Sequence, residues 1–143
     1  QKQKNRGAHN FFIKQRELAG TKHIIRGTSV KEMYKVLSNN GLLGLVSDQD
    51  AKSKGVFVDF FGTPASTPKG AALFHINTRA PLLLGVCFKE NFKKYHIHFK
   101  AINTKNKSLE EITQEYTSQL EFYIRQYPDQ YFWFHRRWKT KKT

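Results

Sequence analysis

Apolar residues recur at helical spacing in three segments of the chain, which are Ser29–Asn39, Thr67–Arg79 and Ser108–Gln126. The first and last segments begin with a Ser that is followed three residues later by a Glu, the pattern of a capping box. The middle segment begins with Thr67 and Pro68, residue types favoured at the N-cap and at the first helical position. We therefore expect three helices over these ranges.

Four further segments have the pattern of strands. Leu42–Val46 and Leu82–Phe88 are almost continuously apolar, which is typical of strands buried on both faces of a parallel sheet. Val56–Phe61 is also extended, and Tyr95–Lys100 alternates like a half-exposed strand that pairs antiparallel with its predecessor. Helices that alternate with buried strands predict an α/β fold, a layered and mostly parallel sheet flanked by helices. No repeat or linker divides the chain, so we expect one domain over residues 1–143.

The composition describes a globular and strongly basic chain. Its 143 residues include 25 Lys and Arg against 11 Asp and Glu, which gives a net charge of +14. Aromatic residues at 14% argue against intrinsic disorder, and a single cysteine, Cys87, excludes a disulfide framework within the chain and a multi-cysteine zinc site. The surplus charge, concentrated towards both ends, indicates an acidic protein, an anionic membrane or nucleic acid as partner, or simply a solvated surface.

The first candidate site is the acidic sequence Ser47–Asp50, directly after the expected strand Leu42–Val46. In open α/β sheets, functional residues gather beyond the carboxyl ends of strands, where a carboxylate can bind a metal, orient a base or hold an arginine. Asp and Ser are also common in surface turns, so a structural role remains open. Two acids without a third ligand nearby do not predict a metal site, and we expect no cofactor.

The second candidate site runs from Val56 to Gly70, where an aromatic strand end leads to a helix start. Ser66, Thr67 and Lys69 stand at that start, and the unpaired N–H groups of a helix N-terminus favour an anion. An ordinary capped helix explains the same residues, so the motif alone is only suggestive.

The third candidate site is the segment Tyr131–Lys139, in which aromatic residues are interleaved with Arg136 and Arg137. Such a segment can stack on bases, lie in a membrane interface or pack the rim of the domain. No zinc-finger, RNA-recognition or helix-turn-helix signature accompanies it, so nucleic acid is not expected as the partner. His96 and His98 share one strand face without Cys partners, and we interpret them as surface residues.

Several motifs occur together in one order along the chain. They are Arg16 with Gly20, Asn39-Asn40-Gly41, Ser47–Asp50, Val56–Gly62, Ala65–Thr67 and Pro128–Lys139. Over almost the whole chain they resemble the C-terminal part of the lipid A biosynthesis acyltransferases, the lauroyl and myristoyl transferases that act on Kdo-lipid A. The resemblance implies a glycerolipid acyltransferase-like fold, present here as a partial domain. It also implies acyl transfer from acyl carrier protein to a lipid A precursor at the cytoplasmic face of the bacterial inner membrane.

The catalytic unit of that family is a His followed five positions later by Asp or Glu. The His takes the proton of the acceptor hydroxyl, and the carboxylate orients the imidazole. None of the six histidines here has an acid at that position, which holds Lys14, Thr28, Ala80, Ala101, Asn103 and Thr140 in turn. We therefore expect the dyad and the family's hydrophobic anchor to lie upstream of Gln1. The isolated chain, a fragment or processed form, should be inactive.

The resemblance assigns the supporting half of the site. Arg16 matches an arginine that acts on the thioester oxyanion or on an acceptor phosphate, although it also fits a surface arginine. Asp48 matches an acid that holds Arg16 or shapes the acceptor site. An N-terminal helical segment, docked through Phe11, Phe12 and Leu18, should bring Arg16 close to Asp48 in space.

The remaining candidates are substrate-binding residues, which are Phe60, Phe61, Gly62, Thr67, Arg136 and Arg137. The resemblance places the Phe-Phe-Gly residues along an acyl or acceptor pocket, although packing also explains the two Phe. It places the two arginines on lipid phosphates or on the carrier protein, although both also fit the rim of the domain. The expected partners are the acyl carrier protein thioester, a phosphorylated glycolipid acceptor and an anionic membrane surface that the chain contacts peripherally. The alternative is a basic module that binds anionic membrane or nucleic acid without chemistry.

Overall fold

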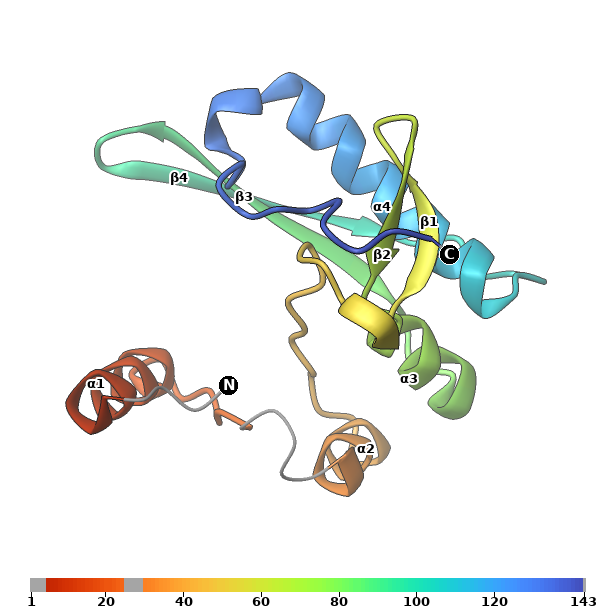
Figure 1. The fold of residues 1–143 in the computed structure, drawn as a ribbon. Helices are drawn as coiled ribbons and strands as arrows, with labels where there is room; N and C mark the ends of the chain where they lie inside the picture. Colours follow the sequence, from red (N-terminus) through yellow and green to blue (C-terminus); the bar gives the residue numbers. More distant parts are fainter. Residues whose placement is uncertain (1–4, 25–29, 143) are drawn as a thin grey trace. The chain divides into compact units, whose positions relative to one another are not determined.

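The computed structural model describes residues 5–24 and 30–142 of the chain (Figure 1). The fold divides into two compact units, Gln1–Leu43 and Gly44–Thr143, and each is described by itself. The assignment of residues 1–143 to a single domain stays a prediction.

The described residues of the first unit form two helices, α1 (Arg6–Glu17) and α2 (Val30–Ser38). Helix α1 begins after Asn5, whose side-chain oxygen accepts a hydrogen bond from the N–H of Ala8 at 2.9 Å. Helix α2 confirms the predicted helix, although Ser29 of the expected capping box lies outside the described residues. After α2 the chain turns through Asn40, whose φ is 55°, and the N–H of Gly41 donates to Val36 O at 2.8 Å.

The predicted buried strand Leu42–Val46 is wrong. No residue of this segment is in a strand, and the side chains of Leu42 and Val46 are 90% and 86% exposed. A short apolar run becomes a strand only when a neighbour pairs with its backbone, and no described segment pairs with this one. The boundary between the two units falls inside the run, which therefore serves as their connection.

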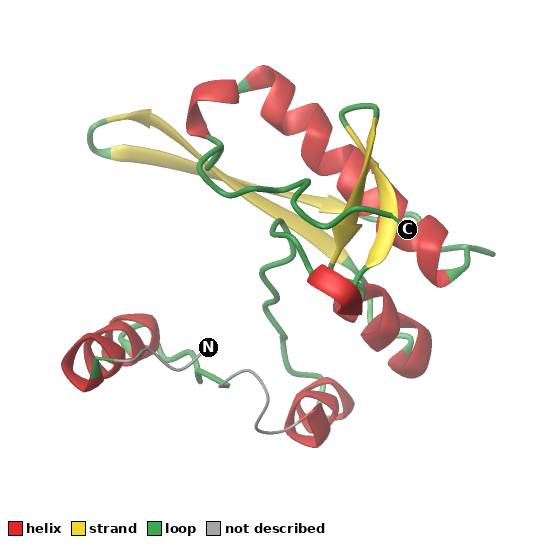
Figure 2. Ribbon diagram, in the orientation of Figure 1, coloured by secondary structure: helices red, strands yellow, loops and turns green. Residues whose placement is uncertain are grey.

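The second unit consists of two β-hairpins, two α-helices and two short 3-10 turns (Figures 1 and 2). In chain order these are η1 (Lys52–Lys54), β1 (Val56–Phe60), β2 (Thr63–Thr67), α3 (Gly70–Thr78), β3 (Leu83–Asn91), β4 (Lys94–Ala101), α4 (Leu109–Gln126) and η2 (Pro128–Gln130). The mixed α/β class is confirmed. Both sheets are two-stranded and antiparallel, and residues 44–142 contain no parallel strand pair.

The predicted helix start at Thr67 and Pro68 is wrong. Thr67 is the last residue of β2, where it pairs with Val56, and helix α3 begins only at Gly70. The Thr67 hydroxyl donates to Ala65 O at 3.0 Å, so it does not cap the helix. Pairing with β1 thus outweighs the local helix-start signal. The remainder of the predicted helix is present and ends at Thr78, followed by Arg79 as its C-cap with a φ of 59°.

The turn between β1 and β2 is formed by Phe61 and Gly62, with φ values of 57° and 76°. Two positive φ angles in a two-residue loop match the type I′ hairpin turn, which glycine accepts readily and phenylalanine only rarely. Tertiary contacts hold Phe61 in place. Its N–H donates to Glu121 Oε2 at 2.7 Å, and its ring lies 4.7 Å from the guanidinium carbon of Arg125.

Helix α4 carries the core of the second unit. It begins with the predicted capping box, in which the Ser108 hydroxyl accepts from the Glu111 N–H at 3.2 Å and Glu111 Oε2 accepts from the Ser108 N–H at 2.8 Å. Its buried residues are Ile112, Thr113, Tyr116, Thr117 and Ile124. Ile112 and Tyr116 form one apolar cluster with Ala72 of α3 and Ile102 after β4. Ile124 forms a second cluster with Phe60 of β1 and Ala65 of β2.

The β3–β4 hairpin confirms the predicted antiparallel pair but is more exposed than expected. Phe88 is the buried side chain of β3, whereas every residue of β4 is exposed. One face of the hairpin packs on α4 and the residues after it, where the ring of Phe88 stacks on Tyr127 with centroids 4.2 Å apart. The prediction that Leu82–Phe88 is buried on both faces is therefore wrong, because only one layer covers this ribbon in the described unit.

Two glutamine side chains close strand edges. The N–H of Asp59 in β1 donates to Gln114 Oε1 at 2.7 Å, and Gln114 Nε2 donates to Asp59 O at 3.1 Å. In β3 the N–H of Lys89 donates to Gln130 Oε1 at 2.7 Å, and Gln130 Nε2 donates to Lys89 O at 3.0 Å. Each primary amide makes both hydrogen bonds that a neighbouring strand would make.

Candidate functional site

The acid turn, which we define as Ser47–Asp50, lies in the second unit and is held by the C-terminal segment, defined as Tyr131–Thr140. The Tyr131 hydroxyl donates to Asp48 O at 3.3 Å. The N–H of Asp50 donates to His135 Nε2 at 2.9 Å, and the Thr140 hydroxyl donates to Asp50 Oδ2 at 2.9 Å. Residues more than 80 positions later in the sequence therefore fix the turn at three points.

Arg137 lies at the centre of the same region and is 2% exposed. Its Nη1 donates to Ser66 O at 2.8 Å, and its Nη2 donates to Thr67 Oγ1 at 2.5 Å. The guanidinium carbon also lies 5.1 Å from the ring centroid of Phe60. This one side chain therefore joins the C-terminal segment to the end of β2.

The charge of Arg137 interacts with Asp48 and Asp50 of the acid turn. Burial lowers the pKa of the Arg137 guanidinium from its ordinary value, while Tyr131, Asp50 and Asp48 act in the opposite direction. Arg137 Nε and the Oδ1 atoms of both aspartates are buried, and none of these three atoms has a hydrogen-bond partner within the described ranges. Burial, followed by the charge of Asp48, raises the pKa of the Tyr131 phenol, so it remains a neutral donor to the Asp48 carbonyl.

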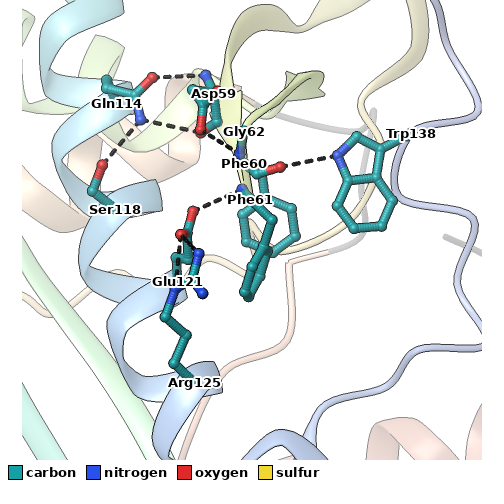
Figure 3. A network of polar contacts seen from close by, with 9 residues as sticks. All are labelled: Asp59, Phe60, Phe61, Gly62, Gln114, Ser118, Glu121, Arg125 and Trp138. Carbon is teal, nitrogen blue, oxygen red and sulfur yellow. Dashed lines mark hydrogen bonds and ion pairs between the residues drawn. The ribbon is translucent and has the colours of Figure 1, made fainter.

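A second network surrounds the turn between β1 and β2 (Figure 3). Trp138 Nε1 donates to Phe60 O at 3.1 Å, and the indole stacks on the Phe60 ring with centroids 5.4 Å apart. On the helix side, Glu121 accepts from the N–H of Phe61 and forms an ion pair with Arg125 at 2.6 Å. Partial burial raises the pKa of Glu121, but its bonds to the Phe61 N–H and to Arg125 outweigh that effect and lower the pKa below its usual range.

The structure separates the predicted substrate-binding residues into two groups. Phe60, Thr67 and Arg137 are buried, at 0%, 1% and 2% exposure, and contact other parts of the unit. Gly62 and Arg136 are exposed and Phe61 is half-buried, so these three lie within reach of a ligand. Their roles in binding stay predictions.

Arg16 lies in the last turn of α1, where it is exposed and its Nη1 is 3.5 Å from His23 Nε2. It belongs to the first unit and Asp48 to the second, so the predicted proximity of these two residues stays a prediction.

The sequence pattern did not identify His135, Tyr131 and Thr140 as partners of the acid turn. A signal was present, because two distant motifs each carry polar residues among apolar neighbours, an arrangement that favours mutual pairing. His96 forms a contact with a carboxylate of its own, 2.6 Å from Glu90 Oε2, but both groups are exposed and Lys94 binds the same oxygen. That arrangement is typical of a surface ion pair.

Neither a membrane span nor a metal centre is found in residues 5–24 and 30–142. No helix in these ranges is long and apolar enough to cross a bilayer. Within the same ranges, no three His, Cys, Asp or Glu side chains are grouped in a way that could hold a metal ion.

Comparison with known proteins identifies the relationship. A sequence model of the bacterial lipid A biosynthesis acyltransferases matches residues 1–140. The chain belongs to this family. The phosphatidylinositol mannoside acyltransferase of Mycobacterium tuberculosis (strain ATCC 25618 / H37Rv) is 35% identical over 83 residues, which are 55% of this chain and 26% of that protein. The chain thus spans about a quarter of that relative's length. The resemblance drawn from the motifs is confirmed.

Proposed function

We propose that this chain is the supporting part of a site that transfers an acyl group from acyl carrier protein to a hydroxyl of a lipid A precursor. The observation that carries the proposal is the family match over residues 1–140. The relative's name also describes an acyltransferase whose substrate is a glycolipid. The geometry adds an acid turn held at three points, in which the Asp48 carboxylate has an oxygen not bonded to any described residue.

In the proposed reaction, the acceptor hydroxyl attacks the thioester carbonyl, the new C–O bond forms, the C–S bond breaks and the carrier thiol leaves with a proton. A general base must take the hydroxyl proton. No histidine in this sequence has an acid five positions later, so we assign that task to a dyad upstream of Gln1. Arg16 would stabilise the oxyanion or bind a phosphate of the acceptor, and Asp48 would orient Arg16 or the acceptor.

The donor and acceptor are both acidic, which suits a chain with a net charge of +14. Exposed Arg136 and the Phe61–Gly62 turn are the positions from which the chain would contact them. We propose the cytoplasmic face of the bacterial inner membrane as the place of the reaction, with this part of the protein bound peripherally.

The tip of the β3–β4 hairpin supports peripheral binding. Phe92 is 84% exposed there, Lys89 Nζ lies 5.4 Å from its ring centroid, and Lys93 and Lys94 follow directly. An exposed aromatic ring flanked by lysines suits the headgroup region of an anionic leaflet. We expect the chain to co-sediment with anionic vesicles, and K93E/K94E to reduce that binding more than K141E/K142E does. Equal binding to neutral vesicles at high salt would contradict this electrostatic account.

We also retain the proposal that the β3–β4 ribbon belongs to a layered, mostly parallel sheet in the longer protein. Tyr95, Ile97 and Phe99 line one face of β4 and are 60%, 63% and 71% exposed. A further layer that covered this face would bury them, as the layered fold requires.

An acyl-transfer assay tests the function. The purified 143-residue chain, given an acyl carrier protein thioester and a lipid A precursor, should form no ester detectable by mass spectrometry. A version extended upstream of Gln1 to include a His followed five positions later by Asp or Glu should form ester, and D48N should slow it at least about tenfold. Turnover by the short chain would show that the proposed base is wrong. An inactive extended version would reject the proposed reaction.

A further inference from the structure

We propose that His135 is a positioning residue for Asp48, held neutral in the tautomer that carries its proton on Nδ1. Only the role of the Asp48 carboxylate in the reaction rests on the proposed function. The contacts that carry it all lie within the second unit.

The hydrogen bond to the acid turn selects one form of the imidazole. The N–H of Asp50 can only donate, and it lies 2.9 Å from His135 Nε2, so that nitrogen must present a lone pair. A neutral ring with a lone pair on Nε2 carries its hydrogen on Nδ1. In the opposite tautomer and in the protonated ring, Nε2 carries a hydrogen. It would then face the Asp50 N–H as a second donor, and no hydrogen bond could form. Only one of the three forms of His135 therefore accepts the hydrogen bond from the Asp50 N–H.

The same contacts give Asp48 and Asp50 different roles. Asp50 uses its N–H on His135 and its Oδ2 on the Thr140 hydroxyl, so both its backbone and its side chain bind the C-terminal segment. Asp48 contributes its backbone carbonyl to Tyr131, while its Oδ1 has no partner in the described part of the chain. Both aspartates have a buried Oδ1 without a partner among the described residues, but only Asp50 also binds the C-terminal segment through its side chain, so we assign Asp50 to anchoring and Asp48 to a ligand.

The anchoring restricts the backbone that carries the Asp48 side chain. Tyr131 holds the carbonyl of residue 48 and His135 holds the N–H of residue 50, so the two peptide groups between them have little freedom to rotate. Loss of the His135 bond would release the second point and let the Asp48 carboxylate swing. A carboxylate displaced by about 1 Å loses much of its effect on a reacting group.

Two measurements on the 143-residue chain test the tautomer and the bond. Long-range ¹H–¹⁵N spectra of histidine-labelled protein at pH 8 should show His135 with hydrogen on Nδ1 and a lone pair on Nε2, the opposite of the tautomer that free histidine prefers. Hydrogen exchange at the Asp50 amide should accelerate about tenfold in H135L, the factor expected for one lost hydrogen bond. H135Q should keep the slow exchange, because the glutamine oxygen can accept where Nε2 does. H96Q is the matched control and should leave Asp50 unchanged.

The reaction provides the third readout. In an active extended protein, H135L should lower kcat/KM about tenfold or more, and H135Q should restore most of it. Hydrogen on Nε2 of His135, or unchanged Asp50 exchange in H135L, would overturn the proposal even if acyl transfer occurs. If no version of the protein transfers acyl groups, the proposed reaction fails, while the spectra and the exchange rates still decide whether His135 fixes the turn. Should H135L not fold, the wild-type tautomer alone decides.

Discussion

Replacing Arg137 with alanine removes a cation that is 2% exposed and joins three parts of the second unit. Its two hydrogen bonds end on Ser66 O and Thr67 Oγ1, and its charge lies among the acids of the turn. The substitution therefore leaves two buried oxygens without a donor and brings Asp48 and Asp50 together without a compensating charge. We expect R137A to be among the most destabilising single changes in the second unit.

The magnitude follows from burial and bonding. A hydrogen bond from a charged donor contributes about 1.5–3 kcal/mol, and removal of one partner from a buried charged group destabilises a protein by about 3–5 kcal/mol. These figures describe overlapping effects and are not summed, so R137A should lose about 3–5 kcal/mol. R137K retains a charge but not the planar fork that reaches both oxygens, and it should lose about 1.5–3 kcal/mol, the contribution of one hydrogen bond from a charged group.

Urea unfolding followed by tryptophan fluorescence measures these losses where they occur. Both tryptophans, Trp133 and Trp138, lie in the C-terminal segment beside Arg137. With a urea dependence of about 1–3 kcal/mol per M, R137A should lower the midpoint by about 2 M. R136A is the matched control, because its neighbouring side chain is exposed and should change stability by less than about 0.5 kcal/mol. If R137A unfolds within about 1 kcal/mol of R136A, the electrostatic reasoning is refuted.

Three further predictions concern stability. Because the pKa of Glu121 is lowered in the fold, its contribution to stability is present above its usual value of 4.5 and is lost as the pH falls through the folded pKa. The urea midpoint of wild type should therefore exceed that of E121Q by more at pH 7 than at pH 3. G55A should lose more than about 2 kcal/mol in thermal unfolding, since its new methyl group would lie 2.9 Å from Thr67 O, whereas G70A meets nothing within 4 Å and should be neutral. S108A should lose about 1 kcal/mol through the capping box of α4, and an unchanged melting temperature would contradict that assignment.

The elements that the sequence predicted correctly are those whose signal is local. Helix α4 combines a capping box with an apolar stripe over eighteen residues, and both are present in the structure. The β3–β4 hairpin alternates along Tyr95–Lys100, and its antiparallel pairing is confirmed. In these elements, each residue's preference agrees with its neighbours, so tertiary contacts have nothing to override.

The errors occur where a distant partner decides the outcome. Leu42–Val46 has strand composition but no pairing strand among the described residues. Thr67 is a residue type suited to a helix cap, but it pairs with Val56 of β1 and its hydroxyl accepts a hydrogen bond from Arg137. Arg136 and Arg137 are indistinguishable in sequence, yet Arg136 is exposed and Arg137 is buried, where Arg137 binds oxygens of Ser66 and Thr67. The support of the acid turn by His135 depends on contacts across 85 residues, which no local pattern predicts.

Gln114 and Gln130, which close strand edges, limit how copies of this molecule can aggregate. An open strand edge is a template on which another chain can add a strand, the first step of ordered aggregation. Gln114 blocks that template on β1 and Gln130 blocks it on β3, each with a single neutral side chain rather than a charge. Among the described residues, no glutamine side chain binds the outer edge of β4 in this way. Misassembly in concentrated solution should therefore start on β4, and lysines placed along that strand should improve solubility more than lysines placed along β1.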